Sequence, residues 1–102
     1  MTQKSDKVFN NSEMRTFEMQ LKALGSLVRV KILRSVSKGS KSVLDISREV
    51  GLSQPSSSSQ VNILWSAGFL TKTKVGKYVY YSLDKTEFEM FQQTLLNYLT
   101  PN

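Results

Sequence analysis

The feature that most constrains the fold of this chain is a three-residue break between two helical patterns, at Gly51-Leu52-Ser53. The segment before the break carries apolar side chains at Val43, Ile46 and Val50, which lie on one face of a helix. Gly favours the left-handed conformation that ends helices, and Ser is a preferred helix N-cap. Because so short a connection makes the second helix cross the first steeply, the sequence predicts a helix-turn-helix.

The helix after the break is predicted from a second apolar set, Val61, Leu64 and Ala67. Pro55 lies in its first turn, where a missing N–H costs nothing. Four serines, residues 56–59, fill the N-terminal half of this segment. A serine run can be a flexible linker, because Ser is a poor helix former. This run is short and directly flanked by helical patterns, so we favour a helix.

Two further helices are predicted before this motif. Residues 12–24 and 26–36 place an apolar side chain every three or four positions, the period of a helix face. Ser26 is the expected N-cap between them, and Ser42 with Asp45 resembles a capping box for the next helix. The apolar positions at this spacing are Met14, Phe17, Leu21 and Leu24 in the first helix, and Leu27, Val30, Leu33 and Val36 in the second.

The pattern after the fourth helix changes to that of a β-hairpin. Residues 70–75 and 77–83 are rich in β-branched and aromatic side chains. Gly76-Lys77 lies between them, and Gly at the first central position suits a two-residue type II′ turn. A last helix is expected after the hairpin, with Thr86 and Glu89 as its capping box.

Together these elements predict a mostly α fold with a β-hairpin wing, a winged helix-turn-helix in the order α-α-α-α-β-β-α. A length of 102 residues fits one such domain, which we place at residues 12–100. Residues 1–11 are polar and lack periodicity, so we expect a flexible N-terminal arm.

The charge balance favours an anionic partner. Fourteen Lys and Arg against eight Asp and Glu give a net charge of +6, which suits nucleic acid first and an acidic membrane surface second. No apolar segment approaches the ~20 residues needed to span a bilayer, and the N-terminus lacks the apolar core of a signal peptide. We therefore expect a cytoplasmic protein with no membrane partner.

Cysteine and histidine are both absent from the chain. Their absence excludes disulfides, thiol nucleophiles and the usual transition-metal ligands, and it removes the commonest general base near neutral pH. The acidic residues are scattered, without the paired arrangement that carboxylate catalysis uses. We expect no enzyme activity, no metal site and no cofactor.

The N-terminal half of the helix after the break has side chains that can read DNA. A helix presented by a helix-turn-helix can enter the major groove. Gln can form two hydrogen bonds with adenine, and Ser can donate or accept at base edges and phosphates. The expected DNA-reading residues are Gln54, Ser56, Ser57, Ser59 and Gln60.

The hairpin carries three positive charges, Lys72, Lys74 and Lys77, and no acidic residue. A basic hairpin beside a recognition helix can hold the flanking phosphates, although edge strands also carry Lys simply to prevent strand pairing. We expect Lys74 and Lys77, together with Lys41, to anchor the DNA backbone.

The expected second strand contains three tyrosines, and the helix before the hairpin contains the tryptophan. Tyr78, Tyr80 and Tyr81 have the chemistry to stack on single-stranded bases, but at strand spacing some of them must face the core. We interpret most of them as packing, and we expect Trp65 to pack between the hairpin and the fourth helix.

The stretch from Leu24 to Leu83 resembles the ArsR/SmtB family of bacterial and archaeal transcription regulators. Its most specific part is Gly51-Leu52-Ser53-Gln54-Pro55, followed by Leu64, Ala67-Gly68 and Tyr80-Tyr81. The resemblance implies a winged-helix homodimer that represses transcription by occupying a palindromic operator. It also implies that the first and last helices form the dimer interface.

Those two helices carry more apolar area than so small a core needs, although some of it must cover the subunit's own core. The expected dimer residues are Phe17, Leu21, Phe88, Phe91, Leu95 and Tyr98.

The chain departs from the family at its metal sites. Many members sense metal through a Cys pair in the third helix, where this chain has Ser42 and Leu44. Others use Asp and His in the last helix, where this chain has Asp84 and Thr86. Metal sensing is therefore not expected. The family also often has His where this chain has Ser59 or Gln60, so the operator sequence is not inherited.

We therefore expect a sequence-specific repressor that binds double-stranded DNA as a homodimer, with residues 12–100 serving both DNA binding and dimerisation. The alternative is a winged-helix module that docks another protein and does not bind DNA. Binding of RNA or single strands through the tyrosines is a further alternative. The effector stays open between a small molecule at the dimer interface, a protein partner and none.

Overall fold

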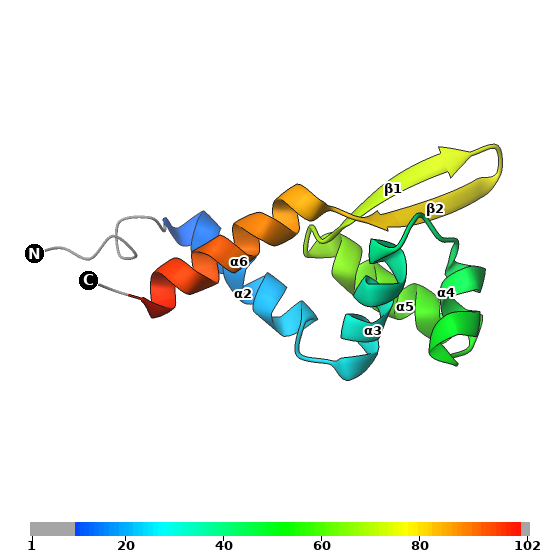
Figure 1. Ribbon diagram of the computed structural model, residues 1–102, viewed down its shortest axis with the longest axis horizontal. Helices are drawn as coiled ribbons and strands as arrows, with labels where there is room; N and C mark the ends of the chain where they lie inside the picture. Colours follow the sequence, from blue (N-terminus) through cyan, green and yellow to red (C-terminus); the bar gives the residue numbers. More distant parts are fainter. Residues whose placement is uncertain (1–9, 101–102) are drawn as a thin grey trace, which may run out of the picture.

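The computed structural model describes residues 10–100. In this part of the chain, five helices and one antiparallel hairpin follow in the order α-α-α-α-β-β-α, which confirms the predicted fold (Figure 1). None of these helices is long and apolar enough to cross a membrane. The elements are α2 (Asn11–Ala23), α3 (Leu27–Ser37), α4 (Val43–Val50), α5 (Gln54–Ser66), β1 (Leu70–Val75), β2 (Tyr78–Leu83) and α6 (Lys85–Leu99).

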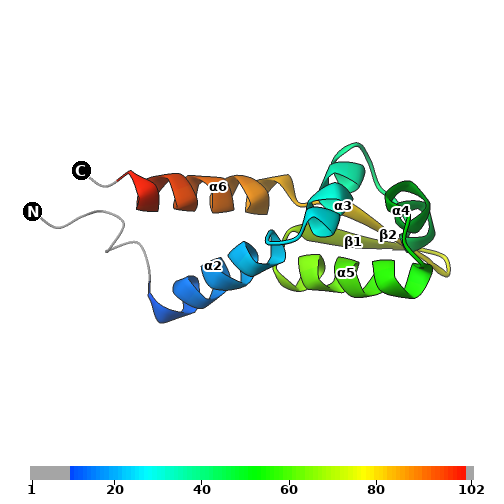
Figure 2. The same ribbon diagram turned by 90° about the horizontal axis from the view of Figure 1, so that it is seen from below.

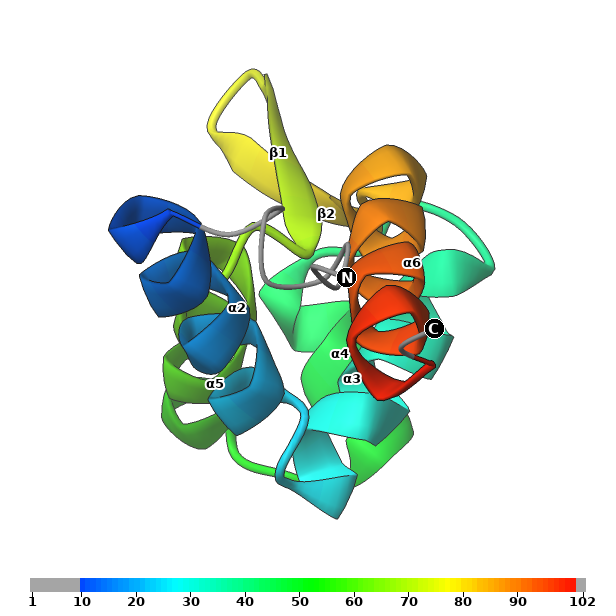
Figure 3. The same ribbon diagram turned by 90° about the vertical axis from the view of Figure 1, so that its left-hand side faces the viewer.

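The molecule has two ends of different character. Helices α3, α4 and α5 and the hairpin form one body, from which α2 and α6 extend in the same general direction (Figures 1 and 2). Seen along the long axis, α2 and α6 lie on different sides of the molecule (Figure 3). Helix α4, the N-terminus of α5 and the tip of the hairpin occupy the opposite end.

The predicted caps around the helix-turn-helix are confirmed. Ser42 Oγ accepts from the N–H of Asp45, and the Asp45 carboxylate accepts from the N–H of Ser42, which completes the capping box of α4. Helix α4 ends at Gly51, whose φ of 75° lies in the left-handed region that Gly adopts without strain. Ser53 Oγ then caps α5 by accepting from the N–H of Ser56.

The first helix begins earlier than expected. Helix α2 starts at Asn11 because Asn10 and Glu13 form a reciprocal capping box, with hydrogen bonds of 2.9 and 2.8 Å. The last two residues of the expected arm therefore belong to the cap and the first turn of α2. The remainder of that expected arm lies outside the described residues.

The last helix also begins earlier than expected, and the predicted capping box of Thr86 and Glu89 is wrong. Asp84 is the N-cap of α6, since its carboxylate accepts from the N–H of Glu87 at 3.0 Å. Because Asp84 already satisfies the first turn, Thr86 lies inside the helix.

The hairpin pairs over its whole length, from Leu70 opposite Leu83 to Val75 opposite Tyr78. Gly76 has a φ of 61° and no non-Gly residue in the described chain has positive φ, which agrees with the predicted type II′ turn. Two backbone hydrogen bonds between Lys41 and Tyr81, of 2.9 and 2.8 Å, join the hairpin to the segment before α4.

The core lies where α3, α4, α5 and the base of the hairpin meet. Phe69, Ile32 and Ile46 are among its largest fully buried side chains. The Phe69 ring meets Phe88 and Phe91 edge-on, with centroid distances of 5.5 and 5.3 Å. These ring contacts fasten the N-terminal half of α6 to the core.

Several of the apolar positions that mark the first two helices face solvent in the structure. Met14 and Leu21 in α2, and Leu27 and Val30 in α3, are exposed rather than buried. Apolar spacing identifies a helix, but the neighbouring elements decide which flank is covered. The buried side chains of the two helices are Phe17, Gln20, Ala23, Ile32, Leu33, Ser35 and Val36.

Candidate nucleic-acid interface

Helices α4 and α5 form the helix-turn-helix that the sequence predicts. The N–H groups of Gly51 and Leu52 both donate to the Ser47 carbonyl, at 2.9 and 3.1 Å, which fixes the turn. Ile46 and Val61 are fully buried in the common core, so the two helices are packed together. The serine run is therefore part of an ordered helix and not a linker.

The N-terminal half of α5 exposes most of the predicted reading set. Gln54, Ser56 and Ser59 are exposed to solvent. Ser57 is 0% exposed, because its spacing of four residues from Val61 places it on the core face. This burial corrects the expectation that Ser57 contacts DNA.

Gln60 is half-buried and already engaged. Its Oε1 accepts a hydrogen bond of 2.8 Å from Arg29 Nη1. The same guanidinium donates from Nε to the Ala23 carbonyl and from Nη2 to the Lys22 carbonyl, at 2.7 and 3.1 Å. Gln60 Nε2 forms no hydrogen bond within residues 10–100, so it remains a donor. Arg29 thus joins the end of α2 to α5.

The polar face of α5 continues beyond the predicted residues. Asn62 is exposed and lies three residues after Ser59, on the same side of the helix. An Asn side chain pairs with adenine as a Gln side chain does. The spacing of three residues from Ser59 could have identified Asn62 from the sequence. The predicted set missed it because that set was limited to the first two turns of the helix.

The hairpin presents two of its lysines to solvent. Lys74 and Lys77 are exposed, and no ion pair of either is found in the described chain. Lys77 Nζ lies 5.6 Å from the ring centroid of Tyr78. Both ammonium groups remain available to phosphates.

Lys72 has a different environment from its neighbours on the hairpin. Its Nζ lies 3.9 Å from the ring centroid of Trp65 and 5.7 Å from that of Tyr81. Such cation–π contacts hold β1 against the end of α5. Trp65 therefore meets the hairpin, although its ring remains partly exposed.

Lys41 is the least available of the predicted phosphate anchors. Its Nζ donates to Glu49 in an ion pair, and Lys38 Nζ lies 3.9 Å from the same carboxylate. The pKa of the Glu49 carboxyl is lowered below its usual value, mainly by the hydrogen bond from Lys41. A phosphate must displace Glu49 before it can bind Lys41.

The electrostatic character of this surface is uniform. No Asp or Glu occurs between Val50 and Leu83, which includes the turn, α5 and both strands, whereas three Lys do. The unpaired N–H groups at the start of α5 add partial positive charge. The surface formed by α5 and the hairpin is therefore suited to a polyanion.

The residues expected at a dimer interface fall into three groups. Phe17 and Phe91 are buried within the subunit, where their ring centroids are 5.6 Å apart and join α2 to α6. Leu21 and Tyr98 are exposed. The other two, Phe88 and Leu95, are half-buried.

Helices α2 and α6 expose further apolar side chains that were not in the expected set. These helices thus carry an apolar surface that residues 10–100 of the subunit do not cover. The additional exposed residues are Met14, Met19, Met90, Leu96 and Leu99.

The positions that match the family's metal ligands have other roles or face solvent. Ser42 caps α4 and Asp84 caps α6, while Leu44 is exposed. Among residues 10–100, no group of three or more His, Cys, Asp or Glu is placed to hold a metal ion.

Comparison with known proteins agrees with this geometry. The family model described as "Bacterial regulatory protein, arsR family" matches residues 27–72, from α3 into β1. The chain is 32% identical over 78 residues to the transcriptional repressor SdpR of Bacillus subtilis (strain 168). That alignment covers 76% of this chain and 87% of SdpR.

Two solved structures share the fold. The homodimeric winged helix-turn-helix DNA-binding domain of Mb0332 from Mycobacterium bovis has a TM-score of 0.73 at 21% identity, covering 83% of this chain and 80% of that one. HlyU from Vibrio cholerae has a TM-score of 0.69 at 27% identity, covering 88% of this chain and 97% of that one. The chain therefore belongs to the ArsR family of winged-helix transcription regulators.

Proposed function

We propose that this chain is a sequence-specific repressor that binds double-stranded DNA as a homodimer. The observation that carries the proposal is the acid-free surface formed by α5 and the hairpin, in which an ordered polar helix lies beside exposed lysines. Membership of the ArsR family supports it, as does the description of the relative SdpR as a transcriptional repressor.

In this proposal α5 is the recognition helix, which enters the major groove. Gln54, Ser56, Ser59 and Asn62 face the base edges or the adjacent phosphates, and Gln60 contributes its remaining donor. Outside the groove, the exposed lysines of the hairpin, Lys74 and Lys77, hold the phosphate backbone, with Lys41 joining them once it leaves Glu49.

A second copy of the chain covers the flank of α2 and α6 on which Met14, Leu21 and Tyr98 lie together, and it leaves open the flank that carries Met90. The Mb0332 domain, which shares this fold, is described as homodimeric. A two-fold axis through these helices would place two copies of α5 at the far ends of the dimer. Such a dimer reads a palindromic operator, with half-sites about one helical turn, roughly 34 Å, apart or a multiple of it.

The proposed repressor does not sense a transition metal. The chain contains no Cys and no His, and the carboxylate that matches a family ligand, that of Asp84, accepts a hydrogen bond as the cap of α6. Cys and His are the usual protein ligands of transition metals, and the chain has neither, so it lacks the side chains for regulation by such a metal.

The test begins with random duplex DNA in gel-shift titrations at rising salt. A dimer that neutralises about eight phosphates gives a slope near −7 of log affinity against log salt concentration. We expect binding at low salt that is lost by ~200 mM. Single-stranded competitors should displace the duplex poorly, because Tyr81 is buried and Tyr80 half-buried, which leaves Tyr78 as the one exposed tyrosine of the hairpin.

Selection of bound fragments from genomic DNA then identifies the operator. We expect a palindrome that binds at least ~1000-fold more tightly than random duplex. Absence of duplex binding even at low salt would contradict the proposal, and it would favour the alternative of a module that docks another protein.

A further inference from the structure

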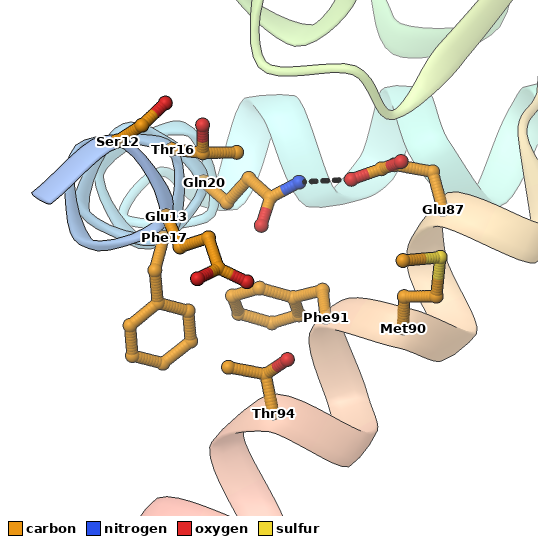
Figure 4. Close-up of a pocket in the computed structure, with 9 residues that line it drawn as sticks. All are labelled: Ser12, Glu13, Thr16, Phe17, Gln20, Glu87, Met90, Phe91 and Thr94. Carbon is orange, nitrogen blue, oxygen red and sulfur yellow. Dashed lines mark hydrogen bonds between the residues drawn. The ribbon is translucent and has the colours of Figure 1, made fainter. Parts of the chain in front are cut away.

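A pocket of about 170 Å³ opens between α2 and α6 (Figure 4). The rings of Phe17 and Phe91 form its apolar walls, together with Met90. Glu13 from α2 and Glu87 from α6 bring two carboxylates to its lining, and no Lys or Arg of residues 10–100 takes part. The pocket therefore combines aromatic surface with negative charge, in a chain whose net charge is +6.

Gln20 closes the inner end of this pocket and is only 4% exposed. Its Nε2 donates to Glu87 Oε2 at 2.8 Å and to the Ala67 carbonyl at 3.1 Å. Both partners are acceptors, so the amide NH₂ must face them and Oε1 must face away. Figure 4 shows Oε1 directed into the pocket, and this oxygen has no hydrogen-bond partner within residues 10–100.

The two carboxylates have no cationic partner in the described part of the chain. Glu13 accepts only the N–H of Asn10, and Glu87 accepts from Gln20. The three ion pairs found among these residues involve neither of them. Glu13 is exposed, whereas Glu87 is half-buried, and a half-buried carboxylate beside aromatic rings favours a cation that can leave water.

We propose that this pocket binds a small organic cation, namely a primary ammonium attached to one ring or a short apolar chain. An ammonium group has three N–H donors, which matches the three acceptors of Glu13, Gln20 and Glu87. The apolar part of the ligand packs against Phe17 and Phe91. A volume of about 170 Å³ lies below the ~300 Å³ at which drug-sized sites begin, so only a small ligand fits.

The pocket is connected to the recognition helix through Gln20. The Ala67 carbonyl that accepts from Gln20 belongs to the C-cap of α5. A ligand that engages Gln20 and Glu87 therefore acts on the group that holds the end of α5 in place. As an effector site, the pocket rests on the proposed repressor function; as a binding site, it does not.

The first experiment titrates the full chain with benzylamine by isothermal calorimetry, with benzyl alcohol as the neutral compound of matching shape. We expect saturable binding of benzylamine with a dissociation constant of a few millimolar or lower, and at least tenfold weaker binding of benzyl alcohol. Equal binding of both compounds, or no saturable binding of benzylamine, overturns the proposal.

Two variants of α6 provide the matched comparison. Glu87→Gln removes the charge from the pocket but keeps the size of the side chain, whereas Glu89→Gln makes the same change at an exposed position outside it. We expect E87Q to weaken benzylamine binding at least fivefold and E89Q to change it less than twofold. An equal effect of the two variants overturns the site. Circular dichroism spectra and urea midpoints of both verify folding.

The connection to α5 is read from Trp65, the only tryptophan of the chain, which lies two residues before Ala67. Its emission should change along the same saturation curve as the calorimetric signal, and it should not respond to benzyl alcohol. Constant emission at saturation overturns the connection. Because these titrations contain no DNA, failure of the gel shifts would refute the repressor function without affecting the site, and the reverse also holds.

Discussion

Arg29 Nη1 donates a hydrogen bond of 2.8 Å to Gln60 Oε1, and this bond joins the start of α3 to the recognition helix. The other donors of the guanidinium bind the two carbonyls at the end of α2. A rigid planar fork of this kind fixes the orientation of what it binds more closely than an ammonium can. Arg29 is therefore placed to hold the Gln60 amide with its NH₂ group away from the guanidinium.

A double-mutant cycle on this pair tests whether Arg29 acts through Gln60. Gln60→Ala should cost about 1–3 kcal/mol of operator binding, and Arg29→Lys should cost part of that. Because both changes remove the same oriented amide, the double variant should lose ~1 kcal/mol less than the sum of the single variants. The measurement is operator affinity for the four proteins, with random duplex as control. Strict additivity would show that the two residues contribute independently.

The lysines of the hairpin should separate into two classes. Lys77→Ala should weaken binding to operator and random duplex alike, and it should reduce the salt slope of the dimer by ~2, one phosphate per subunit. Lys72→Ala should change the slope less, because Lys72 lies against Trp65. The Lys72→Ala substitution should instead alter the fluorescence emission of Trp65, because it removes the ammonium group from the indole ring. Salt titrations of both variants check this difference, and equal slopes would contradict the assignment.

The structure shows which parts of this chain local chemistry determines. The turn from Gly51 to Ser53 and the hairpin turn at Gly76 were predictable, because their residue types favour those backbone conformations. The cap of α6 was misplaced, because Asp84 and Thr86 are both acceptable caps and only the course of the chain after β2 selects one.

The candidate site was harder to predict than the fold. Ser57 and Ser59 have the same side chain, yet only Ser59 reaches solvent, because α4 and α3 cover one flank of α5. The hydrogen bonds of Gln20 and Gln60 join residues far apart in the sequence. Neither periodicity nor composition carries information on such pairs.

Glu49 should contribute to the acid sensitivity of the fold. The hydrogen bond from Lys41 lowers the pKa of this carboxyl in the folded state below its ordinary value near 4.5. A lowered folded pKa stabilises the fold above the unfolded pKa, and that stabilisation is lost as the pH falls through the folded pKa. Urea unfolding at pH 7 and pH 3 should therefore show a smaller difference in unfolding free energy for Glu49→Gln than for the wild type. Glu18→Gln, which alters an exposed pair with Lys22, is the control.

Gln20 should matter for stability apart from any ligand. Gln20→Leu removes both hydrogen bonds at the junction of α2, α5 and α6 and leaves the Ala67 carbonyl without its donor. An unsatisfied buried acceptor costs about 1–3 kcal/mol. Gln92→Leu, at an exposed position of α6, should stay within ~0.5 kcal/mol of the wild type. Both are measured by urea unfolding at one protein concentration, because dimerisation contributes to stability.

Dimerisation through α2 and α6 is tested by two leucines of nearly equal exposure. Leu21 on α2 is 42% exposed and Leu44 on α4 is 41% exposed, so replacing either with Glu removes similar apolar surface from the isolated subunit. In a dimer formed by α2 and α6, only the charge at position 21 is taken out of water, and a buried unpaired charge is strongly unfavourable. Leu21→Glu should therefore raise the dimer dissociation constant at least tenfold, ~1.4 kcal/mol, whereas Leu44→Glu leaves it unchanged. Sedimentation equilibrium of the two variants decides the matter, because dissociation caused by Leu44→Glu alone would place the interface on the helix-turn-helix.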